Sequence, residues 1–384
     1  MKRVILKILS YVLVAALASG ASFGLAALGQ VSKMDKLDQL SGLIENRYIE
    51  EVDMGKLEDA AAAAMVDALG DRWSYYLTAE EYLSHKEQMN NAYVGIGVTI
   101  TASEDGSGVE ILKVEPDGPG QEAGIQVGDH IVGVEGQSAA GMDTTELRNL
   151  VRGKEGTFVL LTINRGGEVF DLSVERRTVK TAVATGVMLP GNVGLVTITN
   201  FDSRCASESI SAIEDLIEQG AQALVFDVRN NPGGYKDELV KLLDYLLPEG
   251  PLFRSEDYNG KVEVDESDAD CLEMPMAVIV NEDSYSAAEF FAAALAEYEW
   301  ATVVGTQTVG KGYFQVTFTL SDGSAVGLSI GKYTTPKGVS LQEVGITPEV
   351  LVDVDDETYF LIYAGMLAAG EDPQIQAAVD AVLP

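Results

Sequence analysis

The part of the sequence that most constrains the fold lies after residue 180, where short apolar segments alternate with longer amphipathic ones. The segments VGLVTIT, ALVFDVR and MAVIVN are rich in Val, Ile and Leu, which is typical of buried strands. Each is followed by a segment with apolar residues three and four positions apart, which predicts a helix. Such an alternation of strands and helices predicts a layered α/β domain.

The preceding residues show two other patterns. Residues 33–90 predict three helices, the last opened by Thr78 and Glu81 in a capping-box pattern. From Ala92 to about Val179, short apolar runs broken by glycines enclose one helical run, TTELRNLVRG, and predict a small β domain. We therefore divide the chain into a signal or anchor segment (1–32), a helical segment (33–91), a β domain (92–178), an α/β core (179–355) and C-terminal helices (356–384).

The first 32 residues predict export of the rest of the chain. Lys2, Arg3 and Lys7 precede an uncharged run from Ile8 to Ser32 that is long enough to cross a bilayer. An uncleaved single-pass anchor is favoured, because apolar character resumes in FGLAALG after the core YVLVAALA. A cleaved signal peptide is the alternative, since that core is short and small residues follow it. We expect the bulk of the protein outside the cytoplasm, at the cell membrane or secreted.

Charge and ligand-forming residues exclude several classes of function. The chain has 26 basic and 60 acidic side chains, and its net charge of -34 disfavours binding to nucleic acid. Two cysteines, Cys205 and Cys271, and two histidines, His85 and His130, do not form a metal-ligand pattern. We expect no metal or organic cofactor, and we interpret the cysteines as free, with one disulfide as the alternative.

The segment NEDSYSAAEFF, residues 281–291, contains a candidate nucleophile. Ser286 follows an apolar strand and opens an apolar helix, so the N–H of Ala287 is positioned to bind a developing negative charge. A similar strand-to-helix junction, VRNNPGGYKDEL, offers the backbone N–H groups of Gly233 and Gly234. Taken separately, the first segment favours an ordinary helix N-cap and the second favours a plain strand-to-helix turn.

Lys311, in VGKGYFQ, is the candidate base for Ser286. His85 and His130 lie in other segments and would have to reach across domains. A lysine accepts a proton only when burial lowers its pKa, and we expect Val309, Tyr313 and Phe314 to supply that burial. The amide of Gln315 is placed to hold Lys311. Taken alone, however, this segment favours an exposed lysine in a glycine turn before a strand.

Together, these segments resemble the carboxyl-terminal processing proteases, or tail-specific proteases, over residues 37–354. The usual serine motif of that family is S-A-S-A-S-E, with the middle serine as nucleophile and a lysine 25 positions later, which correspond here to Ser286 and Lys311. The supporting glutamine of the family corresponds to Gln315. Tyr285 stands where the family usually has alanine, and Ala288 where it has the third serine.

The resemblance implies a mixed α/β fold: a crotonase- or Clp-like β/α superhelix protease core, an inserted PDZ domain over residues 92–178 and an N-terminal helical segment. The run GPGQEAGIQVGDHIVGVEG is similar to the usual PDZ pattern. A PDZ domain binds an extended peptide as an added strand and captures its terminal carboxylate. Arg148 or Arg152 is a candidate to assist that capture. The implied carboxylate-binding loop is Gly95, Ile96, Gly97 and Val98.

The predicted function is that of an extracytoplasmic serine endopeptidase, which recognises substrate C-terminal tails through its PDZ domain and hydrolyses peptide bonds with a Ser286/Lys311 dyad through an acyl-enzyme. Its partners would be proteins and peptides with accessible C-termini, and its terminal helices permit a homodimer. One alternative is a catalytically silent PDZ adaptor or scaffold at the membrane, which the intact set of Ser286, Lys311 and Gln315 disfavours. A crotonase-like acyl-CoA enzyme is disfavoured by the predicted export and the PDZ pattern.

Overall fold

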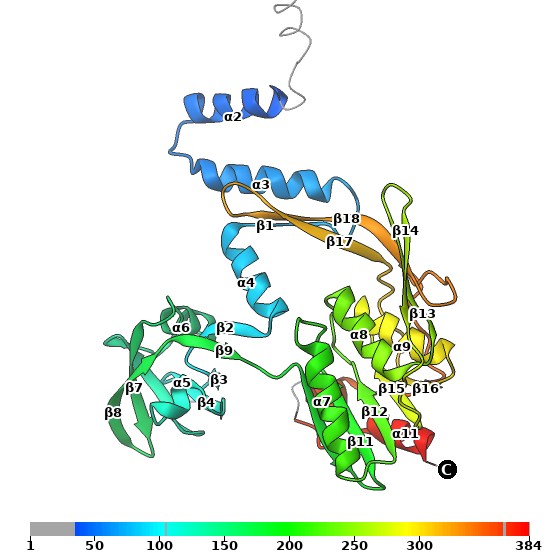
Figure 1. Cartoon of the computed structure of the whole chain (residues 1–384). Coiled ribbons are helices and arrows are strands. Elements are labelled where there is room, and N and C mark those ends of the chain that lie inside the picture. The colour runs from blue at the N-terminus through cyan, green and yellow to red at the C-terminus, as the bar shows by residue number, and fades with distance from the viewer. Residues whose placement is uncertain (1–34, 104–105, 364–365, 384) are drawn as a thin grey trace, which may run out of the picture. The chain divides into compact units, whose positions relative to one another are not determined.

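The computed structural model describes residues 35–103, 106–363 and 366–383 (Figure 1). The predicted signal or anchor segment, residues 1–32, lies outside this range. Among the helices that are described, none is both long enough and apolar enough to cross a membrane. The described residues divide into two compact units, one before Leu69 and one from Leu69 onward.

The described part of the first unit consists of two helices, α2 (Asp35–Arg47) and α3 (Met54–Asp67). Asp53 caps α3 by accepting a hydrogen bond from the Lys56 N–H at 3.2 Å. Only Val66 of α3 is buried, so both helices expose most of their surface. These two helices agree with the first two of the three that the sequence predicts.

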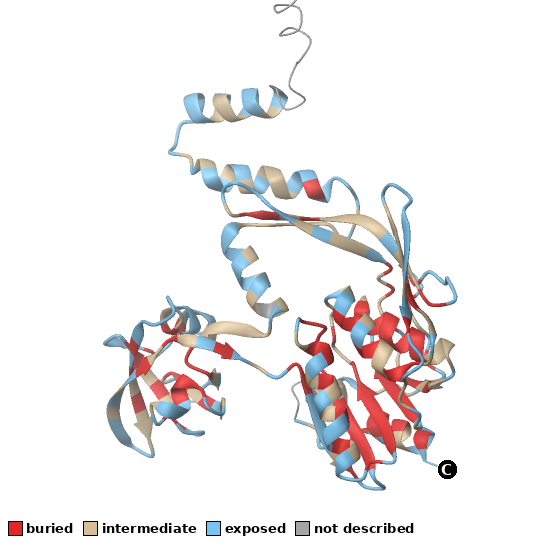
Figure 2. Ribbon diagram, viewed as in Figure 1, coloured by how far each residue is buried: buried red, intermediate tan, exposed pale blue. Residues whose placement is uncertain are grey.

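A six-stranded sheet forms the centre of the second unit, in the order β10-β11-β12-β15-β16-β19. All neighbouring strands are parallel except β10, which runs antiparallel to β11. Strands with both faces covered are apolar throughout, which explains the three apolar runs that the sequence shows. Figure 2 shows that buried residues follow these strands. The strands are β10 (Ala184–Leu189), β11 (Val193–Ile198), β12 (Ala223–Asp227), β15 (Met276–Val280), β16 (Ala301–Gly305) and β19 (Val350–Leu351).

Two hydrophobic clusters cover the opposite faces of this sheet. Ile198, Phe226 and Val280 pack with residues of three helices on one face, and Val225 and Ile279 pack with the last helix on the other. The layered α/β arrangement is therefore confirmed. The helices of the first face are α7 (Cys205–Glu218), α8 (Lys236–Leu246) and α9 (Ala287–Glu297), and α11 (Pro373–Val382) covers the second; α10 (Asp356–Tyr363) precedes α11.

A second sheet adjoins α9 and contains the predicted hairpin. Strands β17 (Tyr313–Thr319) and β18 (Ala325–Thr334) pair antiparallel across the turn at residues 321–323. Strand β1 (Tyr75–Leu77) pairs with the start of β18, and β13 (Gly250–Asp257) pairs with its end and with β14 (Val262–Ser267). The pairing of β1 with β18 brings a segment from before the β domain next to residues near position 329.

Helix α4 (Ala79–Met89) leads from β1 to the small β domain, and the capping box predicted at its start is present. The side chains of Thr78 and Glu81 bond each other's backbone N–H groups at 3.3 and 2.9 Å. Helix α6 (Thr144–Val151) begins at the N-cap Asp143 and accounts for the predicted helical run. The β domain further contains β2 (Ala92–Gly95), β3 (Val98–Ala102), β4 (Val109–Val114), α5 (Pro119–Glu122), β5 (His130–Val134), β6 (Gln137–Ser138), β7 (Phe158–Arg165), β8 (Glu168–Glu175) and β9 (Arg177–Lys180).

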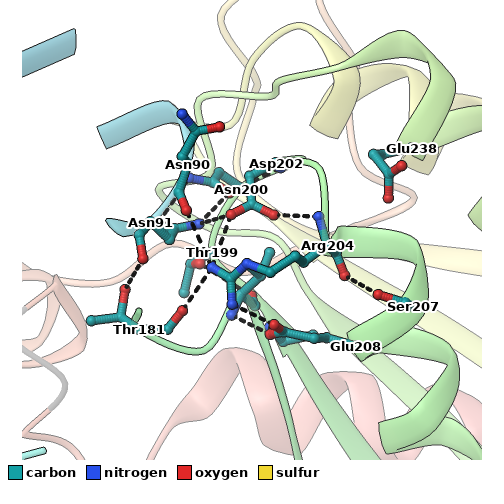
Figure 3. A network of polar contacts seen from close by, with 12 residues as sticks. Asn90, Asn91, Thr181, Thr199, Asn200, Asp202, Arg204, Ser207, Glu208 and Glu238 are labelled. Carbon is teal, nitrogen blue, oxygen red and sulfur yellow. Dashed lines mark hydrogen bonds and ion pairs between the residues drawn. The ribbon is translucent and has the colours of Figure 1, made fainter. Parts of the chain in front are cut away.

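The chain enters and leaves the β domain at one polar network (Figure 3). The amide of Asn91, on entry, donates to the side chains of Asn200 at 2.7 Å and Asp202 at 3.1 Å. Arg204 donates to the Thr181 carbonyl, on exit, at 3.0 Å and pairs with Asp202 at 3.0 Å. Asp202 is fully buried. The chain segments that enter and leave the β domain are thus both hydrogen-bonded to the segment between β11 and α7. The ion pair of Arg204 and Asp202 holds that segment in place.

Candidate active site

The candidate site lies where parallel strands of the central sheet end, which is the usual location of a site in an open α/β sheet. Strands β12, β15 and β16 end at Asp227, Val280 and Gly305, and the predicted segments follow these three ends. Ser286, Gly234, Lys311 and Gln315 line one cleft of about 490 Å³. The structure therefore brings together residues that are far apart in the sequence.

Ser286 is the N-cap residue of α9 and has an unusual backbone conformation. Its φ of 58° and ψ of -124° lie in a region that L-residues rarely occupy. Such strain persists only where the surrounding structure enforces it, and it is often found at functional sites. The conformation places Ser286 directly before the first turn of α9, and the following residue, Ala287, is buried in that turn.

Ser284, the first serine of the motif, fixes the turn rather than lining the cleft. It is fully buried. Its hydroxyl donates to the Val228 carbonyl at 2.8 Å and accepts from the Asn281 N–H at 2.9 Å. In addition, the Tyr285 N–H donates to the Asn231 carbonyl at 3.1 Å. These bonds join the segment after β15 to the segment after β12.

The two glycines predicted to supply N–H groups are in different situations. A Cβ atom on Gly233 would lie 2.8 Å from both the Ala287 nitrogen and Ser286 Cβ, so only glycine fits at this contact. However, the Gly233 N–H already donates to Asn231 Oδ1 at 2.8 Å. Gly234 has a positive φ of 153° and lines the cleft. Of the two, Gly234 is the better placed to donate to a group bound beside Ser286.

Glu289, on the first turn of α9, connects the nucleophile segment to the lysine segment and is fully buried. Its Oε2 accepts from the N–H groups of Ser286 at 3.0 Å and Lys311 at 2.8 Å. Its Oε1 accepts from the Gly310 N–H at 2.7 Å and the Thr308 hydroxyl at 2.5 Å. All four partners are donors, which a carboxylate can satisfy because it is an acceptor only. This role of Glu289 was not predicted from the sequence, although the spacing of Ser286 and Glu289 is that of a capping box.

The environment of Lys311 favours its neutral form. Burial lowers its pKa from the ordinary 10.5 to about 8, against the opposing effects of the carboxylates of Asp71 and Glu289. Its Nζ lies 4.9 Å from the centre of the Trp73 ring and 5.6 Å from that of Tyr285. Trp73 and Tyr285 themselves stack with ring centres 6.1 Å apart.

The residues expected to bury Lys311 are only partly the ones that do so. Phe314 lines the cleft, but Tyr313 is 39% exposed. Trp73, from the segment before β1, and Tyr285, which departs from the usual motif, provide the aromatic faces instead. No local pattern around Lys311 could have identified Trp73, since the pairing of β1 with β18 brings its segment to the site.

Gln315 and His85 also lie in the cleft. The Gln315 amide nitrogen donates to Ser329 Oγ at 2.9 Å and to the Tyr313 carbonyl at 3.2 Å. His85 was not expected at the site from the sequence, and its ring packs on that of Tyr75 with 5.6 Å between the ring centres. Burial and the nearby charge of Lys311 lower the pKa of His85, so it is neutral near pH 7. The other residues lining the cleft are Tyr75, Tyr82, Lys86, Met89, Pro232, Tyr235, Tyr285, Phe314, Val316, Thr317 and Tyr333.

A second cleft, of about 270 Å³, lies in the β domain beside the predicted peptide-binding loop. Gly95, Ile96, Gly97 and Val98 all line it, together with apolar residues of α6 such as Leu147 and Val151. Arg148 and Arg152 also line this cleft. Arg152 pairs with Glu87 of α4 at 3.2 Å. The cleft therefore combines an apolar wall with backbone of the loop and two guanidinium groups.

His130 and the two cysteines of the second unit do not line the cleft. His130 bonds Ser103 Oγ at 2.9 Å, and both cysteines are free thiols, of which Cys205 is buried. Over the residues that the structure describes, no group of three or more His, Cys, Asp or Glu side chains is arranged to hold a metal ion.

Comparison with known families identifies three matching regions. A model described as peptidase family S41 matches residues 192–352, and one described as a PDZ domain matches residues 110–165. A third, described as the N-terminal domain of the activating protease CtpB, matches residues 18–81. The S41 match contains the cleft residues that follow β12, β15 and β16.

Individual proteins are also similar over most of the chain. The carboxy-terminal processing protease CtpA of Bacillus subtilis is 35% identical over 330 residues, which are 85% of this chain and 70% of that protein. A CtpA-like serine protease of Staphylococcus epidermidis is 33% identical over 84% of this chain and 66% of its own length. The crystal structure of an S41 protease from Bacteroides fragilis has the same fold, with a TM-score of 0.56 at 17% identity, over 89% of this chain and 96% of that one.

Proposed function

The chain belongs to peptidase family S41 and is a serine peptidase with a PDZ domain, and from this premise we propose that it hydrolyses exported proteins with a Ser286/Lys311 dyad after binding their C-terminal tails. One observation carries the proposal: a strained serine at the start of α9 shares a cleft with a lysine whose pKa is lowered to about 8. A serine hydroxyl needs such a neighbouring base to become a nucleophile.

In the proposed first step, neutral Lys311 accepts the proton of the Ser286 hydroxyl as the oxygen attacks the scissile carbonyl. The carbonyl oxygen becomes negatively charged, and the N–H groups of Ala287 and Gly234 are the proposed donors that stabilise it. The Ala287 N–H also lies at the N-terminus of α9, where the helix dipole favours negative charge. The Gly233 N–H is assigned instead to holding Asn231.

In the second step, the ammonium of Lys311 returns its proton to the leaving amine, and the C–N bond of the peptide breaks. Ser286 is then esterified in an acyl-enzyme, and Lys311 is neutral again. It next accepts a proton from the water that attacks the ester, and it returns this proton to the Ser286 oxygen as the ester C–O bond breaks and the new C-terminus is released. Each step needs the lysine in both protonation states near neutral pH, which a pKa of about 8 permits.

The mechanism predicts the pH dependence of wild-type hydrolysis. Only neutral Lys311 can act as the base, so we expect kcat/KM to rise about tenfold per pH unit below pH 8 and to level off above it. The measurement is kcat/KM for an unstructured peptide from pH 5.5 to 9.5. If kcat/KM instead rose with a midpoint at or below pH 6.5, and if this rise disappeared in His85→Gln, His85 would be the base.

The β domain is the proposed tail-binding module. Its cleft presents the backbone of the Gly95–Val98 loop, an apolar wall and the side chains of Arg148 and Arg152. A terminal carboxylate is an acceptor that such a loop can bind through backbone N–H groups. The apolar wall favours an apolar C-terminal residue. The strongly acidic chain, with a net charge of -34, provides no long-range attraction for a carboxylate, so local donors must supply the affinity.

Tail recognition predicts that an amidated substrate is cleaved poorly. Converting the C-terminal carboxylate of a peptide to an amide removes a charge-assisted hydrogen bond, so we expect kcat/KM to fall about tenfold or more. The matched control is the same peptide acetylated at its N-terminus, which we expect to be cleaved like the parent. Equal cleavage of the free and amidated peptides would contradict tail recognition while leaving the dyad in place.

The location outside the cytoplasm is proposed from the basic residues 2–7 and the apolar run that follows them. A reporter enzyme that is active only after export is expected to be active when it is fused after residue 384.

Tail binding without any hydrolysis by the full chain would favour the adaptor interpretation.

A further inference from the structure

Asp71 lies outside the S41 match and is bonded to the hairpin that carries Gln315. Its Oδ2 accepts from Ser74 Oγ at 2.6 Å, and Oδ1 accepts from the Trp73 N–H at 3.1 Å. Ser74 Oγ in turn accepts from the backbone N–H of Ser329 at 3.0 Å. Ser329 lies on β18, opposite Gln315 on β17. This segment also carries Trp73, whose ring faces Lys311.

The side chain of Ser329 holds the amide of Gln315. Gln315 Nε2 donates to Ser329 Oγ at 2.9 Å and to the Tyr313 carbonyl at 3.2 Å. A carbonyl only accepts hydrogen bonds, so the group of Gln315 that faces Tyr313 and Ser329 is its NH₂ group. The Ser329 oxygen therefore accepts a hydrogen bond from Gln315.

This direction of bonding decides which end of the Gln315 amide faces the serine. The NH₂ group must lie on the side of Ser329 and Tyr313, because a Gln315 carbonyl oxygen there would face the carbonyl oxygen of Tyr313, which cannot donate. The carbonyl oxygen, Oε1, is therefore on the other side of the amide. Gln315 and Lys311 line the same cleft.

The alternative orientation would oppose catalysis. An amide NH₂ directed at neutral Lys311 would donate to the amine lone pair, which is the one electron pair that can accept the proton of Ser286. Directed at the ammonium form, it would place two donors against each other. A carbonyl oxygen, in contrast, accepts from the amine in both protonation states and leaves the lone pair directed elsewhere.

We propose that Ser329, which accepts from the Gln315 NH₂ group beside the Tyr313 carbonyl, is a positioning residue that fixes the amide of Gln315 with its oxygen toward Lys311. This inference rests on the proposed Ser286/Lys311 function and extends it to residues that do not touch the substrate. Ser329→Ala removes the hydroxyl but keeps the backbone N–H that bonds Ser74, so the pairing of β1 with β18 is retained.

The test is a double-mutant cycle on the full chain, measured by single-turnover hydrolysis of one peptide. We expect Ser329→Ala to lower the rate about tenfold with an unchanged KM, since it removes one hydrogen bond that orients a catalytic group. Ser329→Thr keeps a hydroxyl at this position, so its rate should be close to that of the wild type. In the Gln315→Ala background, Ser329→Ala should have no further effect. Ser321→Ala, at an exposed position in the same hairpin, is the matched control.

The possible results test the role of Ser329 and the proposed function separately. A Ser329→Ala rate equal to wild type, in a protein whose hydrolysis requires Ser286 and Lys311, would overturn the inference and leave the proposed function intact. An equal slowing by Ser329→Ala with and without Gln315 would also overturn it, because Ser329 would then act independently of that amide. Hydrolysis that survives Ser286→Ala would overturn the proposed function itself, and this inference with it.

Discussion

Lys311→Met is expected to remove peptide hydrolysis and, at the same time, to make the protein more stable. Methionine has a similar length and remains packed against Trp73 and Tyr285, but it has no lone pair that can accept the Ser286 proton. General base catalysis contributes about a hundredfold to ten-thousandfold, and Lys311 is the proposed proton acceptor and donor of every step. We therefore expect kcat/KM to fall by at least about a thousandfold.

The expected stabilisation follows from the pKa of Lys311. Because its folded-state pKa is about 8 and its ordinary value is 10.5, burial of the charged form opposes folding. That cost is fully present below pH 8, where the lysine is charged in both the folded and the unfolded state. It amounts to roughly 3 kcal/mol for a shift of this size. As pH rises from 8 to 10.5, the folded state loses its proton first and the cost disappears.

Denaturant unfolding at pH 7 and pH 10 measures both parts of this prediction. The free energy of unfolding of Lys311→Met should exceed that of wild type at pH 7, and the difference should shrink at pH 10. Lys332→Met is the matched control, since Lys332 also lies on the hairpin but its side chain is 53% exposed. A variant that loses hydrolysis but is destabilised at pH 7 would show that Lys311 supports the fold through its charge, contrary to its role as a neutral base.

The sequence predicted the parts of the site that are fixed by local pattern. Ser286 follows an apolar strand and opens a helix, and Gly233 and Gly234 lie at a similar junction, so the neighbouring residues are sufficient to locate them. The mixed α/β fold and the hairpin of β17 and β18 were predicted for the same reason. The pairing of Ser286 with Lys311 needed more, because their 25-residue separation has meaning only through the family resemblance.

The residues that the sequence analysis missed reach the site through tertiary pairing. Asp71 and Trp73 precede the β domain and arrive next to Lys311 because β1 pairs with β18, more than 240 positions away. Ser329 is an ordinary serine in the sequence, and only the pairing of β17 with β18 places its hydroxyl oxygen 2.9 Å from the Gln315 amide nitrogen. His85 was interpreted as a surface or packing residue, yet α4 places it in the cleft. The periodicity of one segment does not indicate which other segment will pack against it.

Tyr285, which stands where the family usually has alanine, contacts Trp73, a residue that is distant in the sequence. Its ring stacks on Trp73 with centres 6.1 Å apart, and both rings face the Nζ of Lys311. Aromatic faces attract an ammonium, whereas burial disfavours it. Tyr285 therefore belongs to the environment of the base, in addition to any effect on the width of the cleft.

Glu289→Gln is the second change expected to have a large effect, although Glu289 does not contact the substrate in the proposed mechanism. Its two oxygens accept four hydrogen bonds, two from the Ser286 and Lys311 backbone and two from Gly310 and Thr308. Glutamine replaces one oxygen by an NH₂ group. Whichever side that group takes, it meets at least one backbone N–H, so buried donors face each other without an acceptor.

We expect Glu289→Gln to lower the free energy of unfolding by about 3 kcal/mol and kcat by about a hundredfold. The second effect follows because the displaced N–H groups belong to the nucleophile and the base, and small misplacements of reacting groups are costly. Loss of the Glu289 charge also removes an effect that raises the pKa of Lys311, so the residual activity should extend to lower pH. Denaturant unfolding and a pH profile of kcat measure these effects.

The matched control is Glu282→Gln, in the same turn, where an exposed glutamate accepts a single bond from the Thr306 hydroxyl at 2.8 Å. Glutamine keeps an oxygen for that bond, so stability and kcat should remain near the wild-type values. Glu289→Asp keeps the charge but is too short to reach both segments, and it should also be slow. If Glu289→Gln were as active as Glu282→Gln, the spacing of Ser286 and Lys311 would not depend on this carboxylate, and the four bonds would serve the fold alone.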